Sequence, residues 1–381
     1  MSIKEESNKL KIVYIVDTLD IGGAEIFLCD LLTELKEFFD IGVVVVKKSG
    51  PLEKRLDDLG IPITCLSIKN ILYFPIGIRK LLNFIQDFRP CFIHSWMYHS
   101  NFLTIFIHYF SRKEKIIWSI HNFNIELGMI KIKTKLVISM TKYFSNFIPR
   151  KIIFCSQSSM KIHLDIGFNK INTILITNGI NLSKYSSTTN KEYLSNCFGI
   201  PKDKFIIGMI ARFDVQKNHI GFIESLSYLK NDYDNFHCIL VGRGCDNSNR
   251  QLINQIERFK LNDFVTLAGE RRDISEILSN INLFAIPSLG EAFPISLCEA
   301  MASSIPCVGN DVGDIRYMLG NNDLVIKAWD PKLFAKKIFY LSSMKENEIK
   351  ALGKSLHERA ISMFDIHSTV HEYKKLYLDE I

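Results

Sequence analysis

The chain has 381 residues, of which 47% are hydrophobic and 23% charged, a composition typical of a folded globular protein and not of a disordered one. This length exceeds one ordinary hydrophobic core, so we expect two domains of roughly 150–200 residues. The net charge of +6 suits an anionic ligand. Proteins that bind nucleic acid usually show denser basic clusters, and we expect no nucleic-acid partner.

The cysteines and the N-terminal segment indicate a cytoplasmic protein. The nine cysteines occur singly, mostly in apolar runs and never with C-x-x-C spacing. This pattern predicts reduced thiols and no zinc or other metal site. The first segment, MSIKEESNKL, is polar and lacks the apolar core of a signal peptide. No uninterrupted apolar run reaches the about 18 residues that would predict a membrane span.

Short apolar runs alternate with helical patterns along the first half of the chain. The runs are continuously apolar, which is typical of a parallel sheet covered on both faces, and the alternation predicts βαβ units. The predicted strands are KIVYIV, IGVVVV, PITCLSI, CFIHS, KIIWSI and KIIFCS.

The same alternation restarts after residues 180–194, a segment rich in Ser, Thr and Asn that we interpret as a linker. The sequence therefore predicts two Rossmann-like, doubly wound α/β domains, residues 1–180 and 181–360, facing a cleft. The amphipathic segment 361–381 predicts a C-terminal helix that closes the chain and packs back on the first domain. The strands predicted in the second half are KFIIGMIA, FHCILVG, FVTLAG, NLFAIPS and IPCVGN.

Ligands of such sheets bind beyond the carboxyl ends of the strands, so residues that follow strands are the candidates. In the loop DTLDIGGAE, Gly22 and Gly23 open a helix whose first amides can face an anion. A tight turn explains the two glycines equally well. The loop lacks the third glycine of G-x-G-x-x-G, which argues against a nicotinamide enzyme.

Two loops of the second half could hold a diphosphate. In MIARFDVQKN, Arg212 and Lys217 follow a strand and could neutralise charge on a departing phosphate. The alternative is a solvated loop with two ordinary surface cations. In LVGRGCDN, Gly242 follows another strand and would let the backbone run close to a nucleotide.

The stretch IPSLGEAFPISLCEAMASSIPCVGNDVGD places Glu291 before a helix and Glu299 inside it. The helix is predicted to begin near Pro294, a favoured first helical residue. Free amides around Phe293 and Ile295 would then point at a ligand. Both carboxylates can accept hydrogen bonds from the hydroxyls of a sugar or a ribose. The alternative is one capping glutamate and one structural glutamate.

Three histidines lie at or just past predicted strands of the first half, His94, His99 and His121. Each could contact a substrate hydroxyl or assist proton transfer, and each could equally be structural. Asp232 and Asp234 have the D-x-D spacing of some metal-dependent sugar transferases. Because they precede a strand, we interpret them as a turn.

Two short apolar segments have two open interpretations. NFLTIFIHYF and KLVISMTKYFSNFI are either core helices or a face that contacts a bilayer or a lipid-linked substrate. The second interpretation depends on the lysines that interleave with the second segment, Lys131, Lys133, Lys135 and Lys142.

Together these motifs resemble family 4 of the retaining glycosyltransferases, which have the two-domain GT-B fold. The resemblance is strongest between Phe205 and Asp314, where ARFDVQKN, LVGRGCDN, VTLAGERRDI and the glutamate-containing stretch follow the family's order. Glu291 and Glu299 match the E-x7-E signature of the family. The details are most similar to bacterial enzymes that build surface polysaccharides.

The resemblance implies a metal-independent, retaining hexosyltransferase without a cofactor. Its nucleotide-sugar donor, UDP- or GDP-linked, would be held by the second domain, and the first domain would bind a saccharide or polyprenyl-linked acceptor. Arg212 and Lys217 would bind the diphosphate and act in catalysis. Glu299 would hold the ribose, and Glu291, with amides near Phe293, the donor sugar.

In the first domain, the resemblance implies that Gly22 and Gly23 approach the diphosphate. His121 matches the position of a catalytic histidine, although the run SIHNFN differs from the Arg-His or Arg-Asn step of many relatives. The resemblance also implies a cytoplasmic protein in peripheral contact with the inner membrane. The alternatives are a sugar-nucleotide epimerase of the same fold and a catalytically silent nucleotide-sugar-binding subunit of a glycosyltransferase complex.

Overall fold

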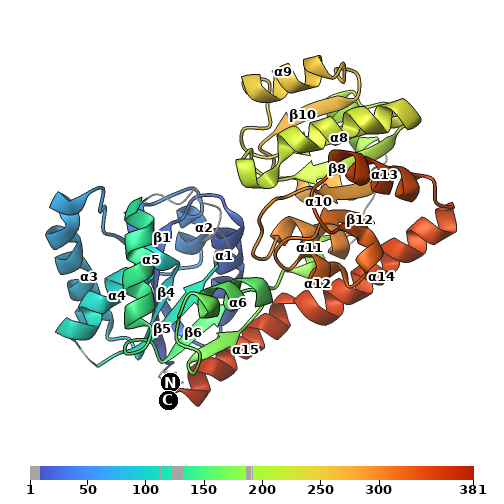
Figure 1. The fold of residues 1–381 in the computed structure, drawn as a ribbon. Helices are drawn as coiled ribbons and strands as arrows, with labels where there is room; N and C mark the ends of the chain where they lie inside the picture. Colours follow the sequence, from blue (N-terminus) through green and yellow to red (C-terminus); the bar gives the residue numbers. More distant parts are fainter. Residues whose placement is uncertain (1–8, 112, 122–131, 186–189, 191) are drawn as a thin grey trace, which may run out of the picture. The chain divides into compact units, whose positions relative to one another are not determined.

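The computed structural model describes residues 9–111, 113–121, 132–185, 190 and 192–381. The chain divides into two compact units: unit 1 is Met1–Gly179 with Ile366–Ile381, and unit 2 is Ile180–Asp365. Each unit is built on its own parallel sheet with helices on both faces (Figure 1). The predicted α/β class with two Rossmann-like domains and a C-terminal helix is confirmed.

The sheet of unit 1 has seven parallel strands in the order β3-β2-β1-β4-β5-β6-β7. The direction of the strand order reverses between β1 and β4, so the carboxyl ends of these two strands flank the switch point, where ligands of such sheets bind. The short strand β7 was not predicted. The strands are β1 Lys11–Thr18, β2 Asp40–Lys48, β3 Ile63–Cys65, β4 Phe92–Trp96, β5 Lys115–Ile120, β6 Lys151–Phe154 and β7 Thr173–Leu175.

Helices α3, α4 and α5 cover one face of this sheet and share a single hydrophobic core with it (Figure 1). Val13 and Ile15 of β1 and Trp118 of β5 belong to this core, together with Leu81 of α3 and Leu103 of α4. The helices of unit 1 before the C-terminus are α1 Gly23–Leu35, α2 Glu53–Asp57, η1 Ile71–Tyr73, α3 Phe74–Phe88, α4 Tyr98–Phe110, α5 Ile132–Phe144 and α6 Gln157–Asp165.

The C-terminal helix α15, Ile366–Asp379, belongs to unit 1. Its Tyr377 hydroxyl lies 2.5 Å from the hydroxyl of Tyr14 in β1 and 2.5 Å from Nδ1 of His94 in β4. Nε2 of His94 lies 2.7 Å from Oγ of Ser119. His94 is therefore fully buried with both ring nitrogens paired, and of its two interpretations the structural one holds.

The sheet of unit 2 has six parallel strands in the order β10-β9-β8-β11-β12-β13. The strand order reverses between β8 and β11, so the loops after these two strands flank the switch point. These loops carry Arg212, Lys217 and Glu291. The strands are β8 Phe205–Ile210, β9 Phe236–Val241, β10 Val265–Gly269, β11 Leu283–Ile286, β12 Cys307–Asn310 and β13 Val325–Ile326.

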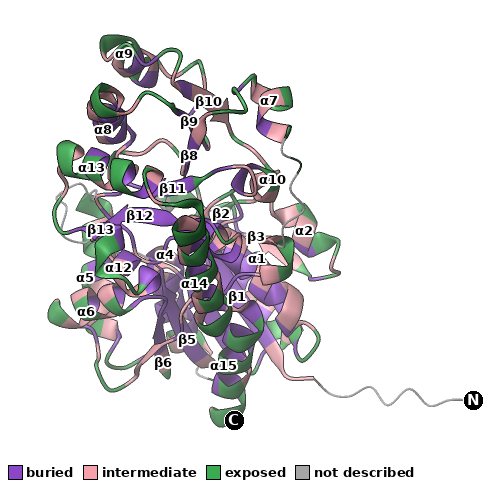
Figure 2. Ribbon diagram, turned by 90° about the vertical axis from the view of Figure 1, so that its right-hand side faces the viewer, coloured by how far each residue is buried: buried purple, intermediate pink, exposed green. Residues whose placement is uncertain are grey.

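Figure 2 shows buried strands, and helices whose outer faces are exposed. Asp232 is the last residue of α8, whereas Asp234 lies in the connection between α8 and β9, so the predicted turn is confined to the residues after Asp232. The helices of unit 2 are η2 Leu182–Tyr185, α7 Tyr193–Phe198, η3 Val215–Lys217, α8 His219–Asp232, α9 Arg250–Arg258, α10 Ile274–Leu278, α11 Ile295–Ala302, α12 Ile315–Leu319, η4 Asn322–Leu324, α13 Pro331–Ser342 and α14 Glu346–Phe364.

We predicted residues 180–194 to be a linker, but the first residues of this stretch belong to the fold of unit 2. Ile180 is buried, pairs in parallel with Asp365 and donates its amide to the carbonyl of Phe364 at 2.8 Å. The helix η2 follows directly and packs against α11. Residues 186–189 and 191 of the predicted linker lie outside the described residues. The polar composition of this stretch gave no indication that unit 2 holds its first residue by backbone pairing.

Candidate active site

The loop after β8 is fixed by two side chains that its sequence supplies. Asp214 caps η3 by accepting a hydrogen bond from the amide of Gln216 at 2.9 Å. Asn218 adopts the left-handed conformation with φ 59°, which asparagine tolerates better than most residues. Its Nδ2 donates to the carbonyl of Pro287 at 3.1 Å. The loop after β8 is thereby tied to the loop after β11, and Lys217 lies between these anchors.

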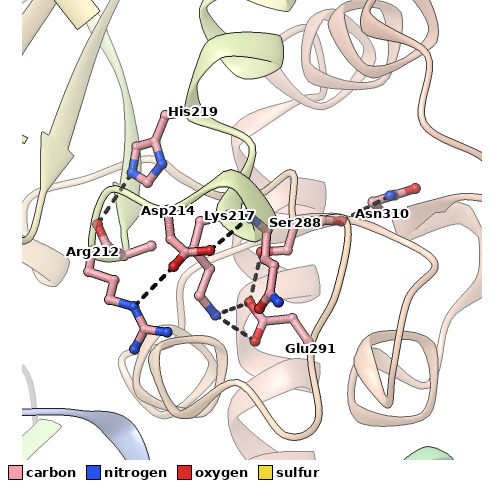
Figure 3. A network of polar contacts seen from close by, with 9 residues as sticks. Arg212, Asp214, Lys217, His219, Ser288, Glu291 and Asn310 are labelled. Carbon is pink, nitrogen blue, oxygen red and sulfur yellow. Dashed lines mark hydrogen bonds and ion pairs between the residues drawn. The ribbon is translucent and has the colours of Figure 1, made fainter. Parts of the chain in front are cut away.

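Lys217 and Glu291 form the central pair of the site (Figure 3). Nζ of Lys217 lies 2.6 Å from Oε1 and 2.7 Å from Oε2 of Glu291. The side chains are 20% and 7% exposed, so solvent screens the pair less than it would a surface pair. The two residues come from the loops on either side of the switch point. Their charges are thus placed where a ligand of this sheet is expected.

Two further residues set the position of Glu291. Ser288 is buried and donates its hydroxyl to Oε1 of Glu291 at 2.7 Å. Asn310, at the end of β12, donates from Nδ2 to the carbonyl of Ser288 at 2.9 Å (Figure 3). Among the described residues, no group donates a hydrogen bond to the buried Oδ1 of Asn310. Sequence reasoning missed both residues, because a serine and an asparagine at strand ends have no distinctive pattern.

Arg212 is held only loosely. Its Nε lies 3.6 Å from Oδ2 of Asp214, and its side chain is 49% exposed. Figure 3 shows Arg212 on the same loop as Lys217. A half-exposed guanidinium with one long ion pair can turn toward an anionic ligand at small cost.

Gly242 is required where the loop after β9 passes the loop after β8. Its φ is +143°, and a Cβ at this position would lie 2.2 Å from the carbonyl oxygen of Ala211 and 3.0 Å from the amide nitrogen of Arg212. A side chain here would therefore displace the backbone that carries Arg212. Gly242 thus serves the packing of two loops. That it lets the backbone run close to a nucleotide stays a prediction.

The helix α11 begins at Ile295, and Pro294 is its N-cap with an extended ψ of 108°. The helix thus begins one residue after Pro294, in agreement with the predicted start near this residue. The amides of Ile295 and Ser296 have no acceptor among the described residues, as expected in the first turn of a helix without a side-chain cap. The ring of Phe293 packs edge-on against Phe364, with centroids 5.3 Å apart.

Glu299 lies on the partly exposed face of α11, one turn beyond Ile295, whereas Leu297, Cys298 and Ala300 are buried. The hydroxyl of Tyr185 in η2 donates to its Oε1 at 2.6 Å. Sequence reasoning missed Tyr185 because it lies in the stretch interpreted as a linker.

His121, in unit 1, directly follows β5. Its ring stacks on Trp96 at 4.1 Å between centroids and lies 6.0 Å from Phe27 of α1. Burial lowers the pKa of His121 to about 3, so the ring is neutral near pH 7. Among the described residues, no group pairs with either ring nitrogen. The ring is therefore a neutral polar group near the helix that Gly22 and Gly23 open.

Gly22 is the N-cap of α1 and Gly23 its first residue, as predicted. Asp17 of β1 accepts hydrogen bonds from Ser100 of α4 at 2.9 Å and from Lys47 of β2 at 3.0 Å, and lies 3.0 Å from Nδ1 of His99 in α4. Burial alone raises the pKa of Asp17, but the bond from His99 and the charge of Lys47 outweigh it and lower the pKa. The second histidine of HSWMYHSN thus has a carboxylate partner.

The structure brings the predicted donor residues Arg212, Lys217, Gly242, Glu291 and Glu299 into unit 2, together with the turn from Phe293 to Ile295. Gly22, Gly23 and His121 lie in unit 1. Of these residues, Lys217 and Glu291 are in contact. The roles expected for all of them in donor binding and catalysis stay predictions.

Two family models match the chain, one in each half. Residues 21–184 match "Glycosyltransferase Family 4" and residues 190–358 match "Glycosyl transferases group 1". The second match covers the candidate donor residues, and the first covers Gly22, Gly23 and His121.

Two curated relatives match nearly the whole chain. The UDP-Gal:alpha-D-GlcNAc-diphosphoundecaprenol alpha-1,3-galactosyltransferase of Escherichia coli is 25% identical and covers 100% of this chain and 99% of its own. The N,N'-diacetylbacillosaminyl-diphospho-undecaprenol alpha-1,3-N-acetylgalactosaminyltransferase of Campylobacter jejuni is 27% identical and covers 93% and 96%.

Among solved structures, Anabaena HepE in complex with UDP and glucose has a TM-score of 0.85 at 19% identity, covering 98% of this chain and 100% of its own. WaaG, a glycosyltransferase involved in lipopolysaccharide biosynthesis, has a TM-score of 0.76 at 12% identity, covering 96% and 99%. Both likenesses concern the fold. Together, the two family models and the full-length relatives show that the chain belongs to family 4 of the glycosyltransferases, with the GT-B fold.

Proposed function

We propose that the chain is a retaining, metal-independent glycosyltransferase that moves a sugar from a UDP-linked donor to a hydroxyl of a lipid-linked saccharide in surface polysaccharide biosynthesis. The Lys217–Glu291 pair at the switch point of unit 2 carries the proposal, because it places a cation and a carboxylate where the donor is expected. The names of the two relatives support a diphosphoundecaprenol-linked acceptor. The name of the E. coli relative and the HepE complex with UDP support UDP as the nucleotide of the donor, and GDP is the alternative.

In unit 2, the donor's diphosphate would bind to Arg212, to Lys217 and to the amides of Ile295 and Ser296. As the bond between the anomeric carbon and the diphosphate breaks, negative charge grows on the diphosphate. Fixed positive groups stabilise that charge without reorganising, which lowers the barrier. The N-terminus of α11 adds the positive end of its dipole.

The two glutamates would hold the uncharged parts of the donor. Glu291, fixed by Ser288, would accept hydrogen bonds from hydroxyls of the donor sugar, and Glu299 from the ribose. Lys217 would then be shared between Glu291 and the diphosphate, so both ends of the breaking bond are held by groups that already contact each other.

The proposed transfer keeps the anomeric configuration. The acceptor hydroxyl attacks the anomeric carbon from the face that the diphosphate leaves, a diphosphate oxygen takes the hydroxyl proton, and the nucleoside diphosphate departs. Lys217 and Arg212 supply the positive charge that Mg²⁺ supplies in other transferases, so we propose that the reaction needs no metal ion. His121, neutral because it is buried, would donate or accept a hydrogen bond at the transferred sugar without becoming charged.

We propose that unit 1 binds the acceptor and contacts a membrane surface through α5. Helix α5 has apolar residues on two faces: Ile138 is buried in the core, whereas Ile132 and Leu136 are 85% and 63% exposed. Ile132, Leu136 and Tyr143 follow helical spacing and form one exposed stripe. Lys133, Lys135 and Lys142 flank it, as in helices that lie on anionic lipid.

The apolar segment of α4 mostly supports the core interpretation, since Leu103, Ile105 and Ile107 are buried. Lys131 lies outside the described residues. Among the helices that the structure describes, none is long and apolar enough to cross a bilayer. We propose a cytoplasmic protein that binds the membrane peripherally through the exposed stripe of α5.

Two alternatives would keep the donor site without the transfer: a sugar-nucleotide epimerase and a catalytically silent subunit. Product analysis separates the three. The purified chain is incubated with UDP-hexoses and a short polyprenyl-diphosphate-linked saccharide, with and without EDTA, and the product linkage is determined by NMR. The proposal predicts that the acceptor is extended by one sugar in α-linkage when the donor is α-linked, at the same rate in EDTA. A β-linked product, an epimerised donor, or an intact donor contradicts it.

A further inference from the structure

The segment that joins the two units contacts the donor residues directly. The chain enters unit 2 at Ile180 and leaves it at Asp365, and these two residues pair with each other. From the entering segment, Tyr185 donates to Glu299 at 2.6 Å. Beside the leaving segment, Phe364 packs on Phe293 at 5.3 Å. Both residues contacted, Glu299 and Phe293, belong to the proposed donor site.

The bond from Tyr185 matters because of where Glu299 lies. Glu299 is on the partly exposed face of α11, where a carboxylate has several rotamers, and each bond that favours one of them lowers the entropic cost of binding a ligand there. Burial raises the pKa of the neighbouring Cys298 thiol and the charge of Glu299 adds to this effect, so the thiol stays neutral beside the carboxylate. The hydroxyl of Tyr185 donates to this carboxylate and so favours one of its orientations.

A carboxylate that accepts a hydrogen bond from one tyrosine hydroxyl can accept further hydrogen bonds. A carboxylate has about four lone-pair sites, so Glu299 can accept from Tyr185 and from a ribose hydroxyl together. Tyr185 is the last residue of η2, which packs on α11.

We propose that Tyr185 is a positioning residue for the ribose end of the donor. Its hydroxyl fixes the Glu299 carboxylate in the orientation that accepts the vicinal ribose hydroxyls. The inference depends on the proposed function, because it assigns the partner of the residue expected to hold the ribose. The opposite role is a competitor: Tyr185 would occupy the place of a ribose hydroxyl and leave when the nucleotide binds.

The test is Tyr185→Phe, which removes only the hydroxyl, with binding of UDP and of 2′-deoxy-UDP measured by titration calorimetry. Tyr340→Phe, an exposed tyrosine of α13, is the matched control. We expect Tyr185→Phe to weaken UDP binding about threefold to tenfold, the net effect of one hydrogen bond. The variant should also lose most of the preference of the wild type for UDP over 2′-deoxy-UDP, which a purely structural role of the hydroxyl would leave unchanged.

Three outcomes overturn the proposal. Equal UDP binding by wild type and Tyr185→Phe removes the role of the hydroxyl while leaving the proposed function intact. Tighter UDP binding by the variant shows the competitor role. Failure of the wild type itself to bind UDP, GDP or their sugars removes the proposed function and the role of Tyr185 with it. In steady-state transfer, positioning predicts a higher KM for the donor with little change in kcat.

Discussion

Lys217 Nζ contacts both carboxylate oxygens of Glu291, at 2.6 and 2.7 Å, across the switch point of the unit 2 sheet. The two residues lie 74 positions apart in the sequence. In the proposed mechanism the lysine serves the diphosphate and the glutamate serves the sugar. The pair thus links diphosphate binding to sugar binding, and substituting one residue at a time distinguishes the two roles.

Glu291→Gln keeps the size of the side chain and removes its charge. We expect sugar transfer to fall by about 10²–10³-fold, as when one preorganised group is removed from an active site. UDP binding should be unchanged or tighter, because Lys217 no longer shares its charge with a carboxylate. Initial rates and calorimetry with UDP test this, with the exposed Glu346→Gln as the control. Near-wild-type transfer would show that Glu291 does not hold the sugar.

Gly242→Ala tests the close passage of the loops after β8 and β9. The new Cβ would lie 2.2 Å from the carbonyl of Ala211, so we expect about 2–4 kcal/mol of destabilisation and a loss of donor binding. Gly199 also has a positive φ, of 68°, but open space around it. Gly199→Ala should therefore cost only the backbone strain, about 1 kcal/mol. Urea unfolding of both variants checks the difference; equal losses would exclude the steric explanation.

The donor residues could be found from the sequence because each has a local signature. Arg212 and Lys217 follow a strand, and Glu291 and Glu299 bracket a strand-to-helix step. The sequence could not show that Lys217 and Glu291 touch, because this contact depends on β8 and β11 being neighbours, which is set by the sheet order and not by any local pattern.

Other parts of the site were hidden for physical reasons. Tyr185 lies in a polar stretch, and only its backbone and packing contacts in unit 2 show that the stretch is structured. Ser288 and Asn310 act through hydrogen bonds that composition does not reveal.

Acid should destabilise unit 1 through its buried histidines. Burial lowers the pKa of His94 and His121 to about 3, and that of His163 to about 4, from 6.5. Between pH 6.5 and these lowered pKa values, the unfolded chain binds protons that the folded chain does not. The contribution of the neutral histidines to the free energy of unfolding is therefore complete above about pH 6.5 and is lost as the pH decreases. The loss approaches about 1.4 kcal/mol per pH unit for each histidine.

His121→Phe should therefore show a shallower loss of unfolding free energy than the wild type between pH 6.5 and 4. Urea unfolding across this range measures both slopes. An unchanged slope would mean that His121 is not buried as a neutral ring.

Leu136→Glu tests the proposed membrane face of α5. The residue is exposed, so the fold should be retained, while binding to anionic vesicles should fall by about tenfold or more. Leu333→Glu, on the exposed surface of α13 in unit 2, is the control. Vesicle sedimentation measures binding, and donor hydrolysis in the absence of vesicles confirms an intact donor site. Equal binding by both variants would place the membrane contact elsewhere or remove it.

The central claim is that unit 2 binds a nucleotide-sugar through cationic side chains. Its most direct test is thermal unfolding of the wild type with UDP-, GDP-, CDP- and dTDP-sugars, each with and without EDTA. A ligand at 100 times its Kd stabilises the folded state by about 2.7 kcal/mol, which shifts the transition measurably. We predict a rise in Tm with UDP-sugars that survives EDTA, is lost in Lys217→Ala and is kept in the exposed control Lys336→Ala. No rise with any of the four classes, or a rise that EDTA abolishes, would contradict the account.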